Sequence, residues 1–307
     1  MWNRPVESVF LYISNNYVST GNIAAFDLDW TLCRTFKGLW PKDPSDIKLM
    51  AGRLDKLKQL NKDGWSIVIF TNQKSTTENK INFNFARVNN FIGMLGDIKV
   101  ITIMSIGDDE YRKPNVGMYQ LLQQVVPDIK QSFYCGDAAG RPGDFSDSDR
   151  MFAQNAGMTF YTPEQIFPRP IINWDNNNDK TMVLFVGMPG VGKTTYYNTN
   201  LEPLGYHHVN QDALKTKAKC LRVTRDLTKS GHNITIDCTN PGLDRRREFY
   251  IYAQQNGYNI VTIYFSGDGR GWNKLRPKPV PTIGYSMYYK YLVEPTPENT
   301  PGVLYEI

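Results

Sequence analysis

The chain has 307 residues, 41% of them hydrophobic and 21% charged, and a formal net charge of +5. This length and composition are typical of an ordinary soluble protein with about two domains, each long enough to bury its own core. No apolar run approaches the roughly 20 residues that a membrane-spanning helix needs, and the amino terminus lacks the basic and then apolar order of a signal peptide. We therefore expect an intracellular protein, and the mild positive charge is compatible with a polyanionic partner.

The few cysteines and histidines argue against a zinc site. The four cysteines are far apart and form no C-x-x-C pair: Cys33, Cys135, Cys220 and Cys238. Three of them sit in or beside apolar runs, so we expect reduced, mostly buried thiols. The three histidines are too poorly spaced for a His/Cys metal site. Any metal should therefore be a hard ion held by carboxylates, which indicates Mg²⁺.

An apolar run at residues 23–27 (IAAFD) ends in an acid, the pattern of a buried parallel strand whose tip faces a crevice. It continues as D-L-D-W-T, with carboxylates at Asp27 and Asp29. Two carboxylates at this spacing can converge on one cation and one phosphoryl group, the first as nucleophile and the second as acid and base. Alone the motif is moderately specific, and a solvent-exposed acidic turn is the alternative.

Three more predicted strands in this half end in polar residues. Residues 66–70 lead into Thr71 and Asn72, residues 100–105 are followed by Lys113 at a predicted helix start, and residues 132–136 precede Asp137 and the more distant Asp149. Helices are predicted over residues 53–63 and 77–95. Because ligands bind at the carboxyl edge of an α/β sheet, four polar strand tips favour a site over a structural role.

These segments resemble haloacid dehalogenase-type (HAD) phosphatases. The resemblance implies that Asp27 is phosphorylated and that Asp29 is the general acid and base. It also implies a Mg²⁺ site formed by Asp27, Asp29 and Asp137. By the same resemblance Thr71, Asn72 and Lys113 hold the transferring phosphate, and Asp149 supports Lys113 or the metal shell.

The resemblance is narrower than the superfamily. The segments FDLDWTL, FTNQ, RKPNVGMY, GDAAGRPGDFSDSDRMFAQNAGM and FYTPEQIF resemble the phosphatase domain of polynucleotide kinase 3′-phosphatases over nearly all of residues 1–168. Trp30 departs from the family, which commonly has glycine there; this side chain either stacks on a terminal base or covers the core. The segment 141–144 is short compared with mammalian members. Since the family-like blocks begin near Trp2, we expect no amino-terminal phosphopeptide-binding module.

A Pro- and Asn/Asp-rich stretch at residues 167–179 lacks periodicity and indicates the domain join. We predict a first domain at 1–170, a linker at 171–179 and a second domain at 180–307.

The second half opens on a phosphate-binding motif. Residues 182–186 (MVLFV) predict a buried strand that leads into G-x-x-x-x-G-K-[ST], a P-loop. Its backbone N–H groups can wrap a polyphosphate, Lys193 adds a charge and Thr194 can ligate Mg²⁺. A Gly-rich turn that matches by chance is the alternative. The predicted ATP-binding residues are Gly187, Met188, Pro189, Gly190, Val191, Gly192, Lys193, Thr194 and Thr195.

Two later strand tips carry aspartates. Residues 207–210 predict a strand followed by Asp212, which is either placed to take a proton from an attacking hydroxyl or is the N-cap of a helix predicted over 213–229. Asp237 ends a strand at 233–237, and its alternatives are to hold water on Mg²⁺, to fix the P-loop or to be a structural acid. The basic run 245–247 is more often a solvated helix surface than a phosphate site.

A Gly/Pro/Lys/Arg-rich segment at 267–281 follows a strand predicted over 260–265. Lids over P-loops have this composition, and Lys274 or Arg276 can then reach the transferring phosphate. A plain surface loop is the alternative.

Residues 179–307 resemble the 5′-kinase domain of the same family through GMPGVGKTT, VNQDAL, IDCTNP, the N-K-L-R of the lid and MYYKYLVEPT. The resemblance implies that Asp212 activates the 5′-hydroxyl. Gln211 stands where relatives often place arginine, so one positive contact is expected to be missing.

Together the two halves predict an α/β protein with two doubly wound parallel-sheet domains, a HAD-like phosphatase followed by a P-loop kinase. The resemblance implies a bifunctional enzyme that heals strand breaks in DNA or RNA with Mg²⁺ and ATP and acts before a ligase. A monomer is our default expectation. A small-molecule phosphatase fused to a metabolite kinase, and an end-binding adaptor with an inactive site, are the alternatives.

Overall fold

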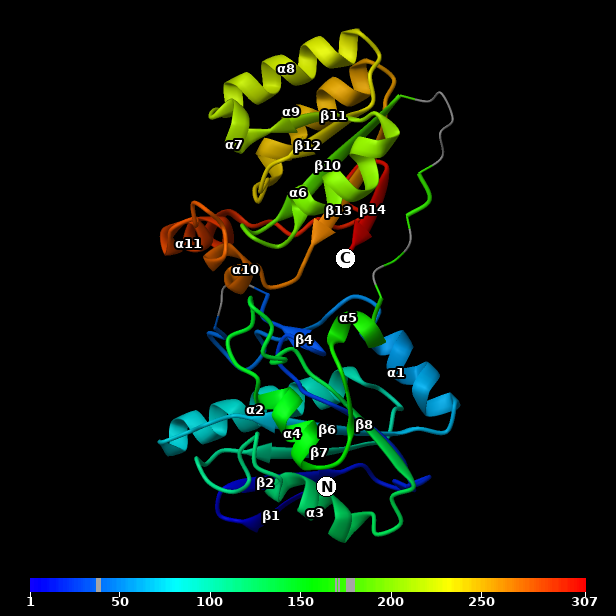
Figure 1. Cartoon of the computed structure of the whole chain (residues 1–307), viewed down its shortest axis with the longest axis vertical. Coiled ribbons are helices and arrows are strands. Elements are labelled where there is room, and N and C mark those ends of the chain that lie inside the picture. Colours follow the sequence, from blue (N-terminus) through cyan, green and yellow to red (C-terminus); the bar gives the residue numbers. More distant parts are fainter. Residues whose placement is uncertain (37–39, 169, 171, 175–179) are drawn as a thin grey trace. The chain divides into compact units, whose positions relative to one another are not determined.

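The computed structural model describes residues 1–36, 40–168, 170, 172–174 and 180–307. The chain forms two compact units, Met1–Pro168 and Arg169–Ile307, each built on its own sheet (Figure 1). The predicted linker, residues 171–179, lies outside the described residues except for 172–174.

The first unit is built on a seven-stranded sheet in the order β1-β2-β7-β6-β3-β8-β9. The pairs from β7 to β9 are parallel, whereas β1 and β2 add an antiparallel edge. A two-stranded ribbon, β4 with β5, lies apart from the main sheet. The strands are β1 (Trp2–Val6), β2 (Val9–Ile13), β3 (Asn22–Phe26), β4 (Cys33–Arg34), β5 (Lys48–Leu49), β6 (Ser66–Asn72), β7 (Val100–Ser105), β8 (Gln131–Cys135) and β9 (Thr159–Tyr161).

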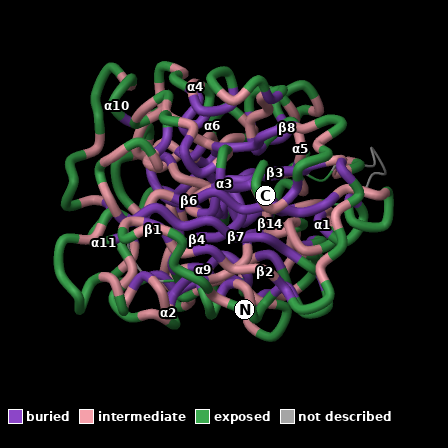
Figure 2. The backbone as a smooth tube through the Cα atoms, turned by 90° about the horizontal axis from the view of Figure 1, so that it is seen from below, coloured by how far each residue is buried: buried purple, intermediate pink, exposed green. Residues whose placement is uncertain are grey.

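Helices cover both faces of this sheet because side chains alternate along each buried strand. Phe26 and Ile69 face a core closed by α1 and α2, whereas Ala25 and Phe70 face a core closed by α3 and α4. Figure 2 shows the buried residues concentrated in the strands. The helices are α1 (Arg53–Lys62), α2 (Glu78–Met94), α3 (Gly117–Val125), α4 (Ser148–Asn155) and α5 (Pro163–Ile166).

The second unit has a five-stranded, entirely parallel sheet in the order β11-β12-β10-β13-β14. The central strand β10 leads directly into the P-loop. The strands are β10 (Thr181–Gly187), β11 (His207–Asn210), β12 (Ile234–Asp237), β13 (Asn259–Phe265) and β14 (Val303–Glu306). The expected class, an α/β protein with two wound sheets, is confirmed, with the antiparallel edge of the first sheet as a refinement.

Short helical segments surround this second sheet. They are α6 (Lys193–Tyr196), the π-helical turn η1 (Tyr197–Leu201), the 3-10 turn η2 (Glu202–Leu204), α7 (Gln211–Leu214), α8 (Lys217–Lys229), α9 (Leu243–Gln255), α10 (Arg270–Lys274) and α11 (Thr282–Tyr291). One face of the sheet packs against α8 and α9 through residues such as Cys220 and Phe249.

Three local predictions differ from the structure. The helix expected over 213–229 is two helices, because the backbone turns at Lys215, whose φ is 69°. Lys113 lies in the loop before α3 rather than at a helix start, since that helix begins at Gly117. The expected lid segment 267–281 contains the short helix α10.

Two other expectations concern the whole chain. The four cysteines are free and buried, in agreement with the prediction. Among the described residues no helix is long and apolar enough to cross a membrane.

Two candidate active sites

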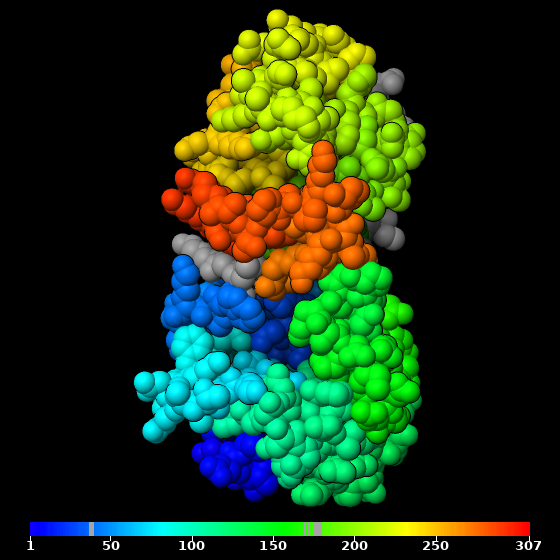
Figure 3. Space-filling model, turned by 60° about the vertical axis from the view of Figure 1, so that its left-hand side comes forward, coloured from blue at the N-terminus to red at the C-terminus, as the bar shows by residue number. Residues whose placement is uncertain are grey.

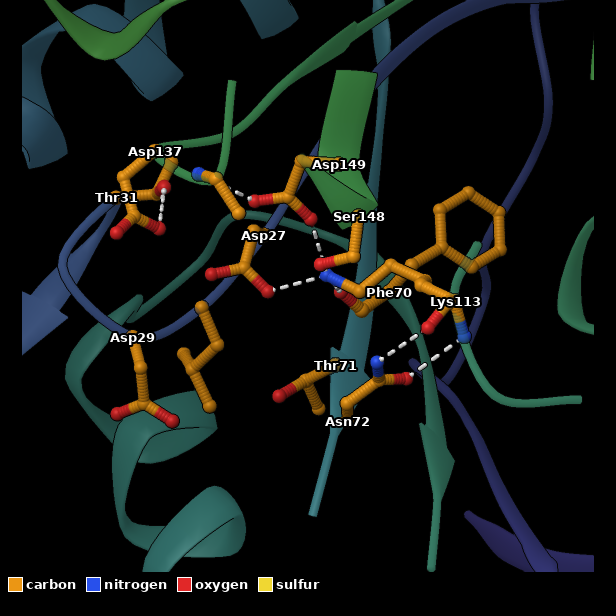
Figure 4. A network of polar contacts seen from close by, with 12 residues as sticks. Asp27, Asp29, Thr31, Phe70, Thr71, Asn72, Lys113, Asp137, Ser148 and Asp149 are labelled. Atoms are coloured by element: carbon orange, nitrogen blue, oxygen red, sulfur yellow. Dashed lines mark hydrogen bonds and ion pairs between the residues drawn. The ribbon is translucent and has the colours of Figure 1, made fainter. Parts of the chain in front are cut away.

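The first candidate site lies where β3, β6 and β8 end at the same edge of the sheet (Figure 4). Asp27 follows β3 directly, and Lys113 reaches it from the loop between β7 and α3. The Nζ of Lys113 donates to Oδ1 of Asp27 at 2.5 Å and to Oδ1 of Asp149 at 2.7 Å. All three residues are buried. Lys113 is therefore the shared counter-charge of two carboxylates.

Further contacts fix this lysine. Its Nζ also donates to the hydroxyl of Tyr134 at 2.7 Å and to the carbonyl of Phe70 at 3.1 Å. The side chain of Asn72 donates to the carbonyl of Lys113 at 3.1 Å and accepts from its N–H at 3.0 Å. Asn72, expected to hold phosphate, is thus bound to the backbone of Lys113 in this structure. Burial would lower the pKa of Lys113, but Asp149 and Asp27 raise it above its ordinary value.

Asp149 sits in the first turn of α4 and comes very close to the end of β8. Its Oδ2 accepts from the N–H of Ala138 at 3.1 Å. A β-carbon on Gly136 would lie 2.4 Å from that same Oδ2, so only glycine leaves room for the carboxylate here. The expected support of Lys113 by Asp149 corresponds to a direct ion pair in the structure.

Three carboxylates gather at this edge. One oxygen each from Asp27, Asp137 and Asp149 lies within 4.8 Å of the other two. Burial raises the pKa of Asp27 to about 7; Lys113 opposes this rise and Asp149 adds to it. Burial, together with Asp27 and Asp149, raises the pKa of Asp137 well above its ordinary value. Three carboxylates thus gather beside Lys113, and their oxygen donors suit a hard cation such as Mg²⁺.

Asp29 is not part of this cluster. Its carboxylate pairs with Arg87 of α2 and accepts from Nε2 of Gln73 at 2.8 Å. Figure 4 shows it apart from the three gathered carboxylates. The same Gln73 amide donates to the hydroxyl of Thr71 at 2.9 Å. The structure therefore links Asp29 to Thr71 through one side chain and leaves its expected place in the metal site a prediction.

Three residues of this site were assigned no role from the sequence. Arg87 carried no signal beyond a basic residue inside a predicted helix, yet it is buried against Asp29. Tyr134 lies in a strand that the sequence predicts to be apolar, where its hydroxyl is easily overlooked. Gln73 directly follows Thr71 and Asn72, so its place after a predicted strand was the available signal.

Trp30 lies between Asp29 and Thr31 with φ at 61°, in the left-handed region that favours glycine. The turn therefore keeps a glycine-like backbone although it carries the bulkiest side chain.

The second candidate site is the loop between β10 and α6. The Nζ of Lys193 donates to the carbonyls of Gly187 at 2.8 Å and Met188 at 2.7 Å. Burial lowers the pKa of Lys193 to about 8. Gly190 has φ at 81°, and a β-carbon there would lie 2.2 Å from the carbonyl oxygen of Gly269. The loop thus has the left-handed glycine and the inward-pointing lysine that P-loop chemistry requires.

Asp237 is the buried centre of this site. Its Oδ2 accepts from the hydroxyl of Thr194 at 2.7 Å, from Nδ2 of Asn210 at 2.9 Å and from Nε2 of His208 at 2.9 Å. Burial would raise the pKa of Asp237, but the hydrogen bonds from His208 and Thr194 lower it below its ordinary value. Asp237 therefore joins β11, β12 and the P-loop helix at one point.

The role of Asp212 as an N-cap is excluded, because the capping side chain of α7 is Asn210, which accepts from the N–H of Ala213 at 3.0 Å. Asp212 is 78% exposed at its side chain, and its Oδ2 accepts from Arg276 at 2.9 Å. The structure thus joins two predicted residues, Asp212 and Arg276. Lys274 and Thr195 are exposed.

The first unit brings Asp27 together with Lys113 and two further aspartates. The second unit has a P-loop, with Asp237 bonded to its Thr194 and with Asp212 bonded to Arg276. Fold and sites define a two-site enzyme of phosphate transfer. The comparisons agree. The family model described as polynucleotide kinase 3 phosphatase matches residues 22–167, and one described as AAA domain matches residues 182–273.

Two relatives span most of the chain. The bifunctional polynucleotide phosphatase/kinase of Schizosaccharomyces pombe is 31% identical over an alignment of 338 positions that covers 95% of this chain and 81% of the S. pombe protein. A protein of Acanthamoeba polyphaga mimivirus, provisionally described in the same words, is 31% identical over 90% of this chain and 82% of its own length. A polynucleotide 3′-phosphatase of Arabidopsis thaliana is 33% identical over 54% of this chain and 27% of the plant protein. The chain belongs to the bifunctional polynucleotide phosphatase/kinase family.

Proposed function

We propose that this enzyme heals strand breaks by removing a 3′-phosphate in the first unit and by phosphorylating a 5′-hydroxyl with ATP in the second. The observation that carries the proposal is that one chain of this family has both polar networks in place, Lys113 between Asp27 and Asp149, and Lys193 with Thr194 on Asp237. The products, a 3′-hydroxyl and a 5′-phosphate, are the ends that a ligase joins. We expect a ligase to act next, and we expect a monomer.

In the first unit, a carboxylate oxygen of Asp27 attacks the phosphorus of the 3′-phosphate, and the bond to the 3′-oxygen breaks. Asp29 gives that oxygen its proton, and later takes a proton from the water that hydrolyses the aspartyl phosphate. Arg87 and Gln73 hold the carboxylate of Asp29 for these two transfers. Lys113 remains paired with Asp27 as its counter-charge, and Thr71 binds a phosphate oxygen.

The carboxylate cluster fits a magnesium ion, since one oxygen from each of its three carboxylates lies within 4.8 Å of the other two. Asp27 and Asp137 would hold the ion, with Asp149 beside them. When bound, the ion supplies the charge that favours ionised Asp27 and offsets the charge of the phosphate.

In the second unit, the backbone of the P-loop and Lys193 bind the phosphates of ATP. Thr194, fixed by Asp237, would hold the Mg²⁺ that accompanies the nucleotide. Asp212 accepts the proton of the 5′-hydroxyl as that oxygen attacks the γ-phosphorus and the bond to the β,γ-bridging oxygen of ATP breaks. Arg276 and Lys274 belong to the segment of α10 and α11, which forms part of the surface of the second unit (Figure 3). We assign both to stabilising the transferring phosphate.

The test uses a nicked duplex with a 3′-phosphate and a 5′-hydroxyl, incubated with Mg²⁺ and ATP, with both ends resolved on a denaturing gel. We expect the wild type to heal both ends. Asp27→Asn should lower the 3′-phosphatase rate at least about 1,000-fold and leave the 5′-kinase rate unchanged. Lys193→Ala should lower the 5′-kinase rate at least about 1,000-fold and leave the 3′-phosphatase rate unchanged. Asp55→Asn and Lys219→Ala, exposed residues of α1 and α8, are the matched controls and should keep both activities.

Other outcomes would contradict the proposal. Cleavage of small phosphate esters without any change at the nick would favour a phosphatase and kinase of metabolites. Unchanged ends with every variant, together with tight binding to the nick, would favour an adaptor protein.

A further inference from the structure

Three consecutive arginines at the start of α9 have three different environments. Arg246 is fully buried. Arg247 is exposed and pairs with Asp244 within its own helix. Arg245 is half-buried, and its side chain leaves α9 to contact Gln211, the residue that precedes the candidate base Asp212. The basic run is therefore not a uniform solvated surface.

The guanidinium of Arg245 is held by neutral oxygens. Its Nε donates to Oδ1 of Asn240 at 3.1 Å, and one Nη donates to Oε1 of Gln211. Asn240 is fully buried, and its Nδ2 donates to the carbonyl of Phe185 on β10 at 2.8 Å. The position of Arg245 is thus fixed from the centre of the sheet that carries the P-loop.

Arg245 differs from Arg247 and Arg276 in its charge balance. Arg276 pairs with Asp212, and Arg247 pairs with Asp244, whereas no ion pair of Arg245 occurs within the part of the chain that the structure describes. Its two contacts use two of the five N–H groups that an arginine carries. A half-buried cation with only amide acceptors is a ready partner for an anion, because charge-assisted bonds are stronger than neutral ones.

We propose that Arg245 binds a phosphate of the acceptor strand, the phosphodiester on the 3′ side of the nucleotide whose 5′-hydroxyl faces Asp212. This inference rests on the proposed kinase function. The guanidinium donates to the side chain of Gln211, the residue that precedes Asp212 in the chain, so a nucleotide whose 5′-oxygen approaches Asp212 can extend its 3′-phosphate toward Arg245. Arginine suits this role because its planar fork matches two phosphate oxygens. Arg245 also supplies the positive charge that Gln211 lacks.

The experiment measures kinase kinetics with two oligonucleotide acceptors that differ only in the first internucleotide linkage, a normal phosphodiester or an uncharged methylphosphonate. With the normal acceptor, Arg245→Ala should raise the acceptor KM at least about tenfold and change the ATP KM by less than about twofold. Arg245→Lys should give an intermediate value. Arg247→Ala, on the same helix, is the matched control and should match the wild type.

The modified acceptor tests the contact itself. Wild type should lose about the same factor on the methylphosphonate, and Arg245→Ala should lose nothing more, because the partner charge is already gone. The role of Arg245 would be overturned if the effects of Arg245→Ala and of the methylphosphonate on the acceptor KM multiplied. It would also be overturned if the ATP KM rose as much as the acceptor KM. A wild type that phosphorylates no oligonucleotide would overturn the proposed kinase function instead, and the inference with it.

Discussion

Gly136 has no β-carbon, and this leaves space for the carboxylate of Asp149. That carboxylate in turn forms an ion pair with Lys113. We predict that Gly136→Ala lowers kcat of the 3′-phosphatase by at least about tenfold, because the new β-carbon displaces the carboxylate and with it Lys113. The kinase rate of the same preparation should be unchanged. Steady-state assays of both activities on separate single-end substrates check this expectation.

Gly93→Ala is the control for that substitution, since a β-carbon at this position of α2 meets nothing within 4 Å. It should leave the phosphatase rate unchanged and stabilise the helix slightly. Equal rates for the two alanine variants would mean that Asp149 does not need its present position.

Lys193 predicts a proton linkage in ATP binding. Burial lowers the pKa of this lysine to about 8 in the free folded protein, below its ordinary 10.5. Because its pKa is lower in the folded protein, Lys193 binds fewer protons there than in the unfolded chain. Its burial therefore lowers the free energy of unfolding by the full amount below about pH 8, and this loss disappears as the pH rises from 8 to 10.5. Bound phosphates favour the charged form and raise the pKa again. ATP binding should therefore take up protons between pH 8 and 9.

Calorimetry of ATP binding in buffers with different ionisation enthalpies measures this uptake. Lys193→Arg, whose side chain stays charged throughout, should bind ATP without it. Proton uptake of the same size in that variant would assign the linkage to another group.

At this residue scale the sequence identifies the groups at strand ends but not their partners. Asp27, Asp137 and Thr71 follow or end predicted strands, and a parallel sheet brings such residues to one edge whatever the details. The pairing of Asp29 with Arg87 joins positions 58 apart in the chain, and nothing in local periodicity indicates it. The N-cap is Asn210 rather than Asp212, a difference of two positions at a strand end that local sequence patterns do not determine.

At the scale of elements, the long amphipathic strands and helices could be predicted, whereas short or edge elements could not. The strand expected at 100–105 and the helix expected at 77–95 agree closely with β7 and α2. The edge strand β14 is only four residues long, and the short helix α10 lies in a Gly/Pro-rich segment. A short segment contains too few residues to show a clear helical or strand periodicity, so its composition dominates the prediction. Its actual secondary structure depends on packing against the rest of the unit.

The break between α7 and α8 yields a stability prediction. Lys215 has a positive φ, which costs a residue with a β-carbon about 1 kcal/mol. Lys215→Gly should relieve this cost and leave the thermal midpoint of the second unit equal or higher, although the contact from Lys215 Nζ to the carbonyl of Asp212 is lost. Arg222→Gly, an exposed position inside α8, should instead lower it, since glycine there costs about 1 kcal/mol.

Calorimetric scans with and without ATP identify which transition belongs to the second unit, because ATP raises only that midpoint. If both glycine variants lower the midpoint equally, the positive φ at Lys215 is not a feature of the folded protein.

At the scale of the whole molecule, each unit has its own sheet and its own hydrophobic core. The two core clusters of the first unit contain only its residues, and the cluster of the second unit likewise contains only its own. Every residue assigned to phosphatase chemistry lies in Met1–Pro168, and every residue assigned to kinase chemistry lies in Arg169–Ile307. The residues assigned to each reaction therefore all lie within one unit.

Separation of the chain should consequently preserve both chemistries. We predict that fragments 1–170 and 180–307 each fold, and that each retains its activity on a single-end substrate within about threefold of the intact chain, because no catalytic contact is removed. Asp27→Asn in the first fragment is the control for residual phosphatase. Loss of activity in a fragment that circular dichroism shows to be folded would mean that a residue beyond the cut acts in that reaction. With both fragments active, any faster healing of a two-ended nick by the intact chain measures what the covalent connection adds, since a bound substrate then meets the second site at a raised effective concentration.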